Sequence, residues 1–412
     1  MKYCLSSTLI GASIVLLNPQ ITNALPSEQV GEIAQGITVL IETTDKSDNG
    51  SGVIIQKQGN TYTVLTAAHV IANLNRKYEI VTSDKQRYQL DYSTVKKLPN
   101  KIDLAVVTFT SNNNYQIAKI GNSKEAKLGS KVYVAGFPKQ NASRKFIDIS
   151  FPPAGKITAN ATQVTDDGYT IGYSIPTLPG MSGGPLLNPQ GELIGIHGRG
   201  EPANLDDIVD IKQSEVAYVK GNNNYAIPIY TFLRQASLVG VNLGITVPPL
   251  QVAQTPTAED SYLKGIKNAQ KGNHPQAILQ FTQAIKSNPN YSEAYYNRGN
   301  AHLVLENYQE AINDFDQATK INPNYVDAYL SKRDIHTKLS KTARKIFNET
   351  QDADTKLSQR AWQISHETQA MLAEQHLFQL LMKTIKDDNP SRQKFITELR
   401  RQQLTDNKNS FN

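Results

Sequence analysis

Three short segments of the sequence contain the residue types of a nucleophile, its general base and a group that orients the base. His69 lies in segment 66–70, Asp103 in segment 101–105 and Ser182 in segment 180–185. A serine hydroxyl becomes reactive when an imidazole accepts its proton and a carboxylate holds that imidazole in place. Taken singly, His69 is better explained as a structural residue and Asp103 as a turn residue. Together, in the order His, Asp, Ser, the three predict acyl transfer through Ser182.

The segment around Ser182 is the most specific of the three, because it reads Gly-Met-Ser-Gly-Gly-Pro from residue 180 to residue 185. Glycine permits a tight backbone bend that leaves the hydroxyl exposed. We expect the amides of Gly180 and Ser182 to point at one spot, where they would stabilise an oxyanion.

These segments must be positioned by a β-rich region. From residue 30 to about residue 241, short runs of strand-forming residues alternate with clusters of Gly, Asn, Asp and Pro. We expect strands at residues 37–42, 51–56, 62–65, 104–109, 131–135 and 193–196. Several short strands at this spacing are typical of an all-β barrel or sandwich. His69 would then follow one strand and Asp103 would open another.

The pattern changes after residues 246–257, which contain three prolines without periodicity and are typical of a semi-extended linker. Beyond the linker, the segment SNPNYSEAY at residues 287–295 recurs as INPNYVDAY 34 residues later. This period predicts helical repeats that resemble tetratricopeptide repeats.

Small residues, aromatic residues and proline occupy corresponding places in the two copies. They are Gly265, Ala277, Phe281, Ala284 and Pro289 in the first copy, and Tyr295, Gly299, Ala311, Phe315, Ala318 and Pro323 in the second. Small residues allow paired helices to approach closely, aromatic side chains fill the gap, and proline ends the second helix. A third copy begins at Tyr329, but Arg333 and Lys345 replace its small residues, so we expect only a capping helix there.

Residues 341–412 form a polar, Gln-rich C-terminal segment with apolar residues at helical spacing. They are Ala361, Ile364, Leu372, Leu377, Leu380, Leu381 and Ile385. This pattern favours one or two amphipathic helices. The apolar stripe is better explained by packing on the repeats than by binding a partner or forming a dimer.

The first 24 residues have the pattern of a secretory signal, with Lys2 before an apolar run and Thr-Asn-Ala at residues 22–24 as a cleavage site. The apolar run is shorter than the roughly 20 residues of a membrane span, although an uncleaved anchor remains the alternative. Cys4 is the single cysteine of the chain. Cleavage after Ala24 would leave a protein without disulfides or thiol chemistry, exported to the periplasm or the medium.

Length and composition exclude several classes of protein. The chain has 412 residues, which favours two or three domains, and its 39% hydrophobic and 19% charged residues exclude disorder throughout. A formal net charge of +6 without a dense basic block gives no support to nucleic-acid binding. The five histidines of the helical half, His274, His302, His336, His366 and His376, lack metal-ligand spacing and are expected to be packing or surface residues. We expect no metal, nucleotide or other cofactor.

Residues 30–240 resemble the chymotrypsin-fold serine proteases. The resemblance rests on the three segments above and on stretches 49–55, 136–138 and 224–229, which are similar to bacterial members, including glutamyl endopeptidases and the high-temperature-requirement proteases. It implies two six-stranded β-barrels, with His69 and Asp103 in the first barrel and Ser182 in the second. It also implies that Ser182 attacks the scissile carbonyl, His69 transfers the proton, Asp103 holds the His69 tautomer, and the Gly180 and Ser182 amides form the oxyanion hole.

Two departures from the digestive members of this family are informative. Met181 occupies the position at which those enzymes carry an aspartate that pairs with a newly cut N-terminus, so that activation switch should be absent. Pro176 occupies the position of the charge at the floor of trypsin-like pockets, so cleavage after Lys or Arg is not expected.

The specificity pocket instead resembles that of glutamyl endopeptidases. Thr177 lies five residues before Ser182 and His197 lies fifteen after it, the offsets of a Thr and a His that contact the substrate's Glu side chain in that family. A hydroxyl and an imidazole can both donate to a carboxylate, and Arg199 would add a second cation. Alternatively, His197 is a strand-end histidine satisfied by the backbone and Thr177 is an ordinary loop residue.

The sequence therefore predicts an all-β double barrel followed by all-α repeats. The expected organisation is a signal peptide at 1–24, a trypsin-like serine protease domain at 25–245, a linker at 246–257, repeats with a capping helix at 258–340 and a helical extension at 341–412. We expect an exported serine endopeptidase whose repeats recruit a protein partner or substrate, with a preference for Glu at the cleaved residue. The alternatives are a quality-control protease of broad specificity, weakened by the lack of a PDZ-like domain, and a catalytically silent scaffold that acts through its repeats.

Overall fold

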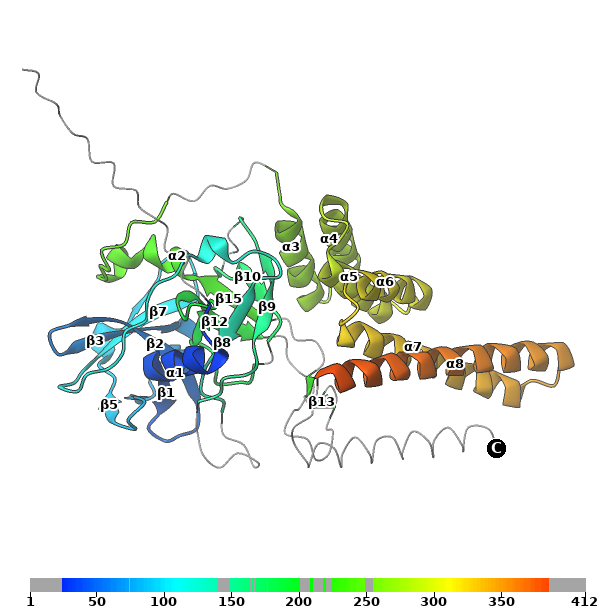
Figure 1. The fold of residues 1–412 in the computed structure, drawn as a ribbon, viewed down its shortest axis with the longest axis horizontal. Coiled ribbons are helices and arrows are strands. Elements are labelled where there is room, and N and C mark those ends of the chain that lie inside the picture. The colour runs from blue at the N-terminus through cyan, green and yellow to red at the C-terminus, as the bar shows by residue number, and fades with distance from the viewer. Residues whose placement is uncertain are drawn as a thin grey trace, which may run out of the picture.

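The structure is a computed structural model that describes residues 24–73, 75–139, 149–163, 165, 167–175, 177–200, 208–209, 218–219, 224–248 and 255–384. The predicted signal segment with Cys4 lies outside the described residues, apart from Ala24, as do Pro176, part of the linker and residues 385–412. Two parts lie side by side, a β-rich part and a helical part (Figure 1). Among the described residues, no helix is long and apolar enough to cross a membrane.

The first β unit is a sheet of seven strands in the order β5-β4-β1-β2-β3-β7-β6. Its strands are β1 (Thr38–Thr43), β2 (Asn49–Gln58), β3 (Thr61–Ala67), β4 (Tyr78–Val81), β5 (Arg87–Gln89), β6 (Lys96–Lys97) and β7 (Leu104–Thr110). Each neighbouring pair is antiparallel. The resemblance implied a six-stranded barrel here, whereas the structure has a seven-stranded sheet whose edge strands, β5 and β6, contain only three and two residues.

The sheet is preceded by helix α1 (Ser27–Ile37), which the sequence analysis did not predict. Val30, Ala34 and Ile37 are fully buried, and their spacing of four and three residues places them on one helical face. The expectation of β structure from residue 30 is therefore wrong for residues 30–37, because the apolar stripe there has the helical period. Strand β1 begins at Thr38.

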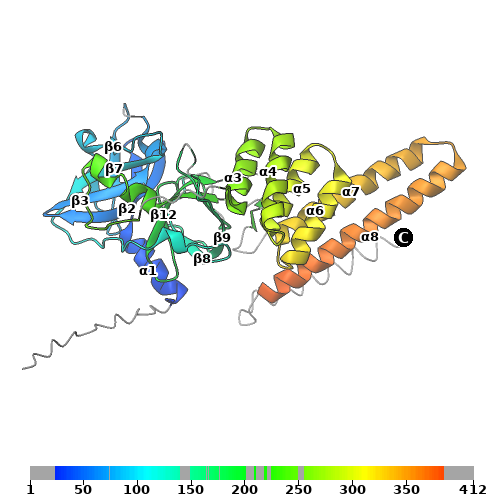
Figure 2. The ribbon, with the colours of Figure 1, turned by 90° about the horizontal axis from the view of Figure 1, so that it is seen from above.

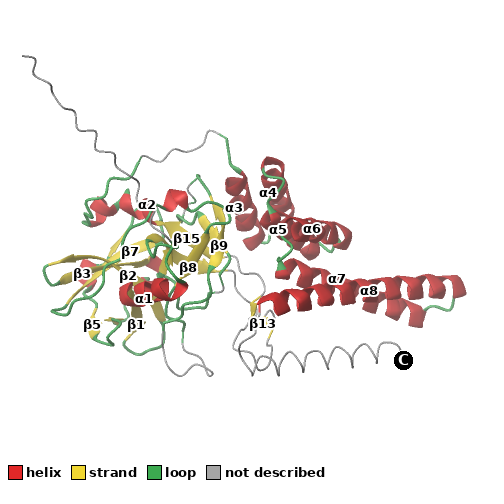
Figure 3. Ribbon diagram, viewed as in Figure 1, coloured by secondary structure: helices red, strands yellow, loops and turns green. Residues whose placement is uncertain are grey.

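The second β unit is a closed six-stranded barrel in the order β10-β15-β12-β11-β8-β9. Its strands are β8 (Lys131–Val134), β9 (Gly155–Asn160), β10 (Ile171–Tyr173), β11 (Pro185–Leu187), β12 (Leu193–Gly200) and β15 (Asn224–Pro228). The short strands β13 (Ile208–Val209) and β14 (Tyr218–Val219) pair with each other, and the short helix α2 (Ile229–Leu233) follows β15. Figure 3 distinguishes this strand-rich half from the helices beyond it. The predicted fold class, a chymotrypsin-like β domain followed by helical repeats, is confirmed.

The helical part contains six helices within the described residues. They are α3 (Ala258–Gln270), α4 (His274–Ser287), α5 (Ser292–Val304), α6 (Tyr308–Ile321), α7 (Val326–Glu349) and α8 (Ala353–Thr384). Seen from above, α3 lies nearest the barrel, α4 to α7 follow outward, and α8 runs back along the repeats (Figure 2).

The predicted packing of glycine against an aromatic ring is present in both repeats. A Cβ added at Gly265 would lie 2.5 Å from the ring of Phe281, and one added at Gly299 would lie 2.8 Å from that of Phe315. Both rings are fully buried. Glycine is thus required at the two places where the paired helices approach each other most closely.

The end of the repeats differs from the predicted boundary at residues 340 and 341. Helix α7 runs through this position to Glu349 and packs along α8. The predicted apolar stripe of α8 does not form one buried face, since Leu377 is buried while Ile364 and Leu372 are exposed by 50% and 44%. Between the two helices, His336 Nδ1 lies 2.8 Å from His366 Nδ1. No group of residues in the described part of the chain could hold a metal ion.

The helical part is fastened to the second barrel by the buried carboxylate of Asp260 at the start of α3. It accepts hydrogen bonds from the amides of Thr162 and Gln163, at 2.9 and 2.8 Å, and from the Thr162 hydroxyl at 2.9 Å. Within α3, Asp260 also forms a capping box with Thr257. A second contact is made by Tyr291, whose buried hydroxyl donates to the carbonyl of Thr158 in β9 at 2.5 Å.

Candidate active site

The predicted base and orienting group are in direct contact. His69 lies in a single turn of 3₁₀ helix after β3, and Asp103 lies immediately before β7, the neighbour of β3. His69 Nδ1 and Asp103 Oδ2 are 2.7 Å apart, and the amide of His69 donates to Asp103 Oδ1 at 2.9 Å. The carboxylate therefore fixes both the backbone and the ring of His69, which leaves Nε2 as the nitrogen available for proton transfer.

Asp103 has a further partner that was not predicted from the sequence. The hydroxyl of Tyr169 donates to Asp103 Oδ2 at 2.7 Å. Burial alone would raise the pKa of Asp103, but hydrogen bonds from His69 and Tyr169 outweigh burial and lower this pKa below its usual range. Burial and the nearby Asp103 charge raise the pKa of Tyr169, so its hydroxyl remains a donor at physiological pH.

The loop that carries Ser182 is attached to the first sheet through Ser51 in β2. The amide of Ser51 donates to the carbonyl of Ser182 at 2.7 Å, and its hydroxyl donates to the carbonyl of Gly180 at 3.0 Å. A Cβ added at Gly183 would lie 1.9 Å from the Ser51 carbonyl and 2.4 Å from Oγ1 of Thr66, three residues before His69. These contacts place the end of β3 and the Ser182 loop against each other, across the boundary of the two β units.

The backbone around Ser182 has the geometry expected of an anion-binding bend. Gly180 and Gly183 have φ angles of +95° and +90°, a region that favours glycine. A Cβ added at Gly180 would lie 2.5 Å from the amide nitrogen of Lys139. Within the described part of the chain, the amides of Gly180 and Ser182 donate to no other group. Both are therefore available to a developing oxyanion.

The hydroxyl of Ser182 is directed at strand β12. Its Oγ lies 3.4 Å from the carbonyl oxygen of Gly198, which is the limit of a weak hydrogen bond. A serine hydroxyl rotates readily, so this contact does not commit its proton.

The predicted pocket residue Thr177 belongs to a short polar network. Its hydroxyl donates to Oδ1 of Asn224 at 2.5 Å, and Nδ2 of Asn224 donates to the carbonyl of Ile175 at 2.5 Å. Asn224 opens β15 opposite Gly200 of β12 and is buried. The single proton of the Thr177 hydroxyl is thus used by Asn224 in this arrangement, which leaves its oxygen as an acceptor.

The second predicted pocket residue, His197, lies inside the barrel. Its Nδ1 is 2.6 Å from the hydroxyl of Tyr173, which is itself fully buried. Burial lowers the pKa of His197 to about 4, and the nearby charge of His69 acts in the same direction, whereas a hydrogen bond to the backbone of Tyr225 opposes them. His197 is therefore neutral at physiological pH.

Arg199, the third predicted pocket residue, contacts residues other than His197. Its guanidinium forms a 2.8 Å ion pair with Asp167 and stacks over the ring of Tyr169, with 5.0 Å to the ring centre. A bulge in β12 between His197 and Arg199 separates the two side chains. The expectation that Arg199 adds a cation beside His197 is not supported by these contacts.

The side chain of Met181 is fully buried in the second barrel, in keeping with a residue that forms no ion pair with an N-terminus. The amide of Leu25, the expected first residue after signal cleavage, donates to the carbonyl of Pro189 at 2.8 Å. Pro189 lies in the turn between β11 and β12. This contact ties the start of α1 to the second barrel.

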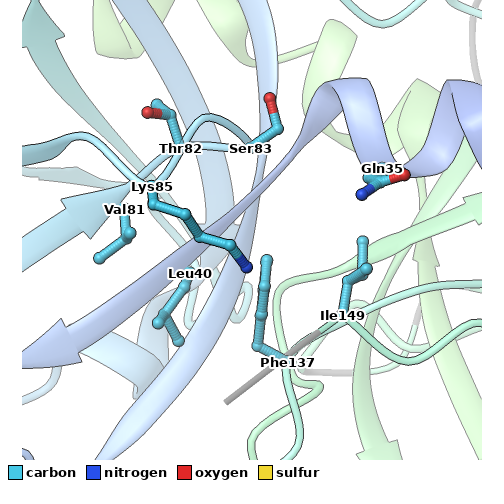
Figure 4. A pocket seen from close by; sticks show the side chains of 8 residues that line it. All are labelled: Gln35, Leu40, Val81, Thr82, Ser83, Lys85, Phe137 and Ile149. Carbon is cyan, nitrogen blue, oxygen red and sulfur yellow. The ribbon is translucent and has the colours of Figure 1, made fainter. Parts of the chain in front are cut away.

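A separate hollow contains none of the predicted site residues (Figure 4). It is lined by Gln35, Leu40, Val81, Thr82, Ser83, Lys85, Phe137 and Ile149. Its apolar wall includes Phe137. The backbone amide of Phe137 donates a hydrogen bond to Oγ of Ser51 at 2.8 Å. The hollow thus borders the residues that hold the Ser182 loop.

Comparison with known proteins agrees with this geometry. The model of the trypsin-like peptidase domain family matches residues 50–196, which include His69, Asp103 and Ser182. Models of the tetratricopeptide repeat match residues 292–325 and 268–306. The predicted repeats are confirmed.

Three relatives illustrate the similarity of the β-rich part. Human serine protease HTRA4 is 30% identical over 154 residues, which are 36% of this chain and 30% of the relative. Serine protease Do-like HtrA of Lactococcus lactis subsp. cremoris is 31% identical over 158 residues, 36% of this chain and 37% of the relative. A probable periplasmic serine endoprotease DegP-like of Pseudomonas fulva is 31% identical over 150 residues, 36% of this chain and 28% of the relative.

The matches thus cover about a quarter to just over a third of each relative's own length. The chain contains a trypsin-like peptidase domain followed by tetratricopeptide repeats, and its peptidase domain is similar to those of HtrA serine proteases.

Proposed function

We propose that this chain is an exported serine endopeptidase that cleaves polypeptides with Ser182, His69 and Asp103. The observation that carries the proposal is the pair of hydrogen bonds between His69 and Asp103, at 2.7 and 2.9 Å, beside a loop whose Gly180 and Ser182 amides are available. An oriented base and two unused donors are what peptide hydrolysis by a serine nucleophile requires.

The reaction follows from these groups. On substrate binding, the Ser182 hydroxyl turns from Gly198 toward Nε2 of His69, which accepts its proton as Oγ bonds to the scissile carbonyl carbon. The amides of Gly180 and Ser182 hold the resulting oxyanion. The imidazolium then returns the proton to the amine that leaves as the C–N bond breaks, and water attacks the acyl enzyme by the same route. Asp103 stabilises the imidazolium throughout.

For specificity, we propose a preference for Glu at the cleaved residue, read by Thr177 and His197. Neutral His197 has one ring N–H, which has to leave its present partner in order to donate to a carboxylate, and the bound charge would raise its pKa toward protonation. Thr177 has to release Asn224 in order to donate as well. The similarity of Thr177 and His197 to the glutamyl endopeptidase pattern supports this preference.

A second specificity is favoured by the same contacts. The Thr177 proton is used by Asn224, and His197 already has Tyr173 and the Tyr225 backbone as partners. A pocket whose polar groups are already satisfied discriminates weakly between side chains. Broad cleavage of exposed segments, as in a quality-control protease, is therefore the alternative.

The repeats and the first 24 residues extend the proposal. We propose that the repeats recruit a protein partner or substrate, because stacked helical repeats form extended surfaces for peptide segments. Residues 1–24 would direct export, with cleavage after Ala24. The similarity to periplasmic DegP-like proteins supports an exported location.

The test is cleavage-site profiling of the purified chain on a mixed peptide pool, with Ser182→Ala as the control for contaminating proteases. Cuts that require Ser182 and cluster after Glu would support both the triad and the acidic pocket. Cuts that require Ser182 but follow many residue types would favour broad specificity. Cleavage by neither protein would refute the endopeptidase and favour a scaffold that acts through its repeats.

A further inference from the structure

We propose that helix α3 of the repeats forms one wall of the substrate cleft, so that the repeat module binds the substrate segment that precedes the scissile bond. The occupant is an extended polypeptide that places an apolar side chain between the barrel and α3. This inference rests on the proposed function, because it takes the bound polypeptide to be the substrate.

The cleft lies where the barrel meets α3. Tyr169, Arg199 and Tyr225 line its barrel side, while Ile266, Lys267 and Gln270 line the helical side. The rings of Tyr169 and Tyr225 and the side chain of Ile266 form its floor and are almost fully buried, whereas Arg199, which is paired with Asp167, and Lys267 are more exposed. Such a lining suits an apolar side chain on a polar main chain.

The cleft is continuous with the predicted catalytic residues. Tyr169 donates to Asp103 at 2.7 Å, and Arg199 directly follows Gly198, whose carbonyl faces Oγ of Ser182. The cleft therefore begins beside the residues that surround Asp103 and the Ser182 hydroxyl.

Strand β12 provides the path for that polypeptide. Its residues up to Ile196 pair with β11, and His197 is bonded to Gly183 and Gly184, whereas from Gly198 to Gly200 the ladder continues only with β15 on the other side. An extended peptide can add itself to such a free edge. Gly200 lies beside Thr177. When a substrate residue occupies the pocket at Thr177, the substrate residues before it would therefore run along β12 toward α3.

Helix α3 is held firmly enough to act as a wall. Asp260 accepts three hydrogen bonds from Thr162 and Gln163 of the barrel, and Tyr291 reaches Thr158. Leu263 and Ile266 of α3 belong to the same hydrophobic core as Tyr169 and Tyr225. The helical wall is therefore part of the packed body that carries the site.

The test compares a short and a long substrate. The short substrate is a single amino acid, the one preferred in the cleavage profile, with a blocked N-terminus and a fluorogenic amide at its C-terminus. The long substrate has six more residues before that amino acid, two of them leucine. Ile266→Ala should lower the ratio of kcat/KM for the long over the short substrate about fivefold, because a buried apolar contact is lost. Leu279→Ala, a truncation at a 61% exposed position of α4, should leave the ratio unchanged.

A second variant and a binding assay make the result decisive. Lys267→Glu changes the partly exposed wall without touching the core, and it should lower the ratio in the same way. In the Ser182→Ala background, each wall variant should weaken binding of the fluorescently labelled long peptide about fivefold. If the wall variants bind the long peptide more weakly but the parent protein cleaves neither substrate, the cleft is supported and the proposed activity is refuted. Equal ratios and equal affinities for parent and both wall variants would overturn the inference.

Discussion

Replacing Asp260 with alanine tests how the two modules are joined. The carboxylate accepts three hydrogen bonds from Thr162 and Gln163 in the barrel and closes the capping box of α3 with Thr257. Burial would raise the pKa of Asp260, yet these hydrogen bonds lower it, so the group is ionised at neutral pH. Asp260→Ala therefore removes a buried charge and leaves two barrel amides without their acceptor.

The size of the effect follows from these contacts. Leaving a buried donor without its acceptor costs about 1–3 kcal/mol, and two amides lose their acceptor in this variant. Water that enters the space left by the carboxylate in the docked state recovers part of this cost. A net loss of about 3 kcal/mol raises the ratio of undocked to docked molecules by about two orders of magnitude. Tyr291 and the apolar contacts of α3 remain, so the variant should still fold.

Hydrogen exchange of the Thr162 and Gln163 amides measures this change directly. Both should be protected in the parent protein and exchange about a hundredfold faster in Asp260→Ala. The control is Asp314→Ala, because Asp314 is also buried and pairs with Arg298 at 2.7 Å, but within the repeats. Asp314→Ala should loosen the repeats without exposing the two barrel amides. Unchanged exchange of both amides in Asp260→Ala would refute the docking role of the carboxylate.

Three further predictions address catalysis and stability. Tyr169→Phe removes the hydroxyl that holds Asp103, so kcat should fall about tenfold with little change in KM. A change in KM as large as the change in kcat would contradict a positioning role. The folded-state pKa of His197 is lowered to about 4, so the contribution of His197 to stability is complete above about pH 6.5 and is lost as the pH falls toward 4. The melting temperature should therefore be lower at pH 5 than at pH 7.5. His197→Gln should make this difference smaller. Gly299→Ala would force a Cβ against Phe315, so calorimetry should find the repeats destabilised by about 1–3 kcal/mol, and an unchanged melting curve would refute the close approach.

Local patterns in the sequence were sufficient to predict the triad segments and the repeats. The bend around Ser182 needs glycine at fixed places, and the contact of Gly265 with Phe281 recurs 34 residues later, so both leave a signature in the order of residues. The relation of His69 to Asp103 was predicted from the residue types, their order and the family resemblance. Their hydrogen bonds depend on β3 and β7 being neighbours, which no local pattern specifies.

Partners that come from distant segments could not be predicted. Tyr169 lies 66 residues from Asp103, and Asp260 lies 98 residues from Thr162. A tyrosine ahead of a strand or an aspartate in the first turn of a helix is common and carries no sign of its partner. Helix α1 is a different case, since the spacing of Val30, Ala34 and Ile37 was visible but was outweighed by the β-rich run that follows.

Gly198 leaves the space through which Tyr169 supplies a third hydrogen bond to the carboxylate of Asp103. A Cβ at position 198 would lie 2.1 Å from the Tyr169 hydroxyl, so strand β12 can carry no side chain there while Tyr169 reaches Asp103. The hydroxyl therefore comes from the segment before β10, and the ring that bears it also lines the cleft against α3. One aromatic residue thus contacts both the orienting carboxylate and the surface shared with the repeats. A change in how α3 packs on the barrel would therefore be felt at Tyr169, which holds Asp103.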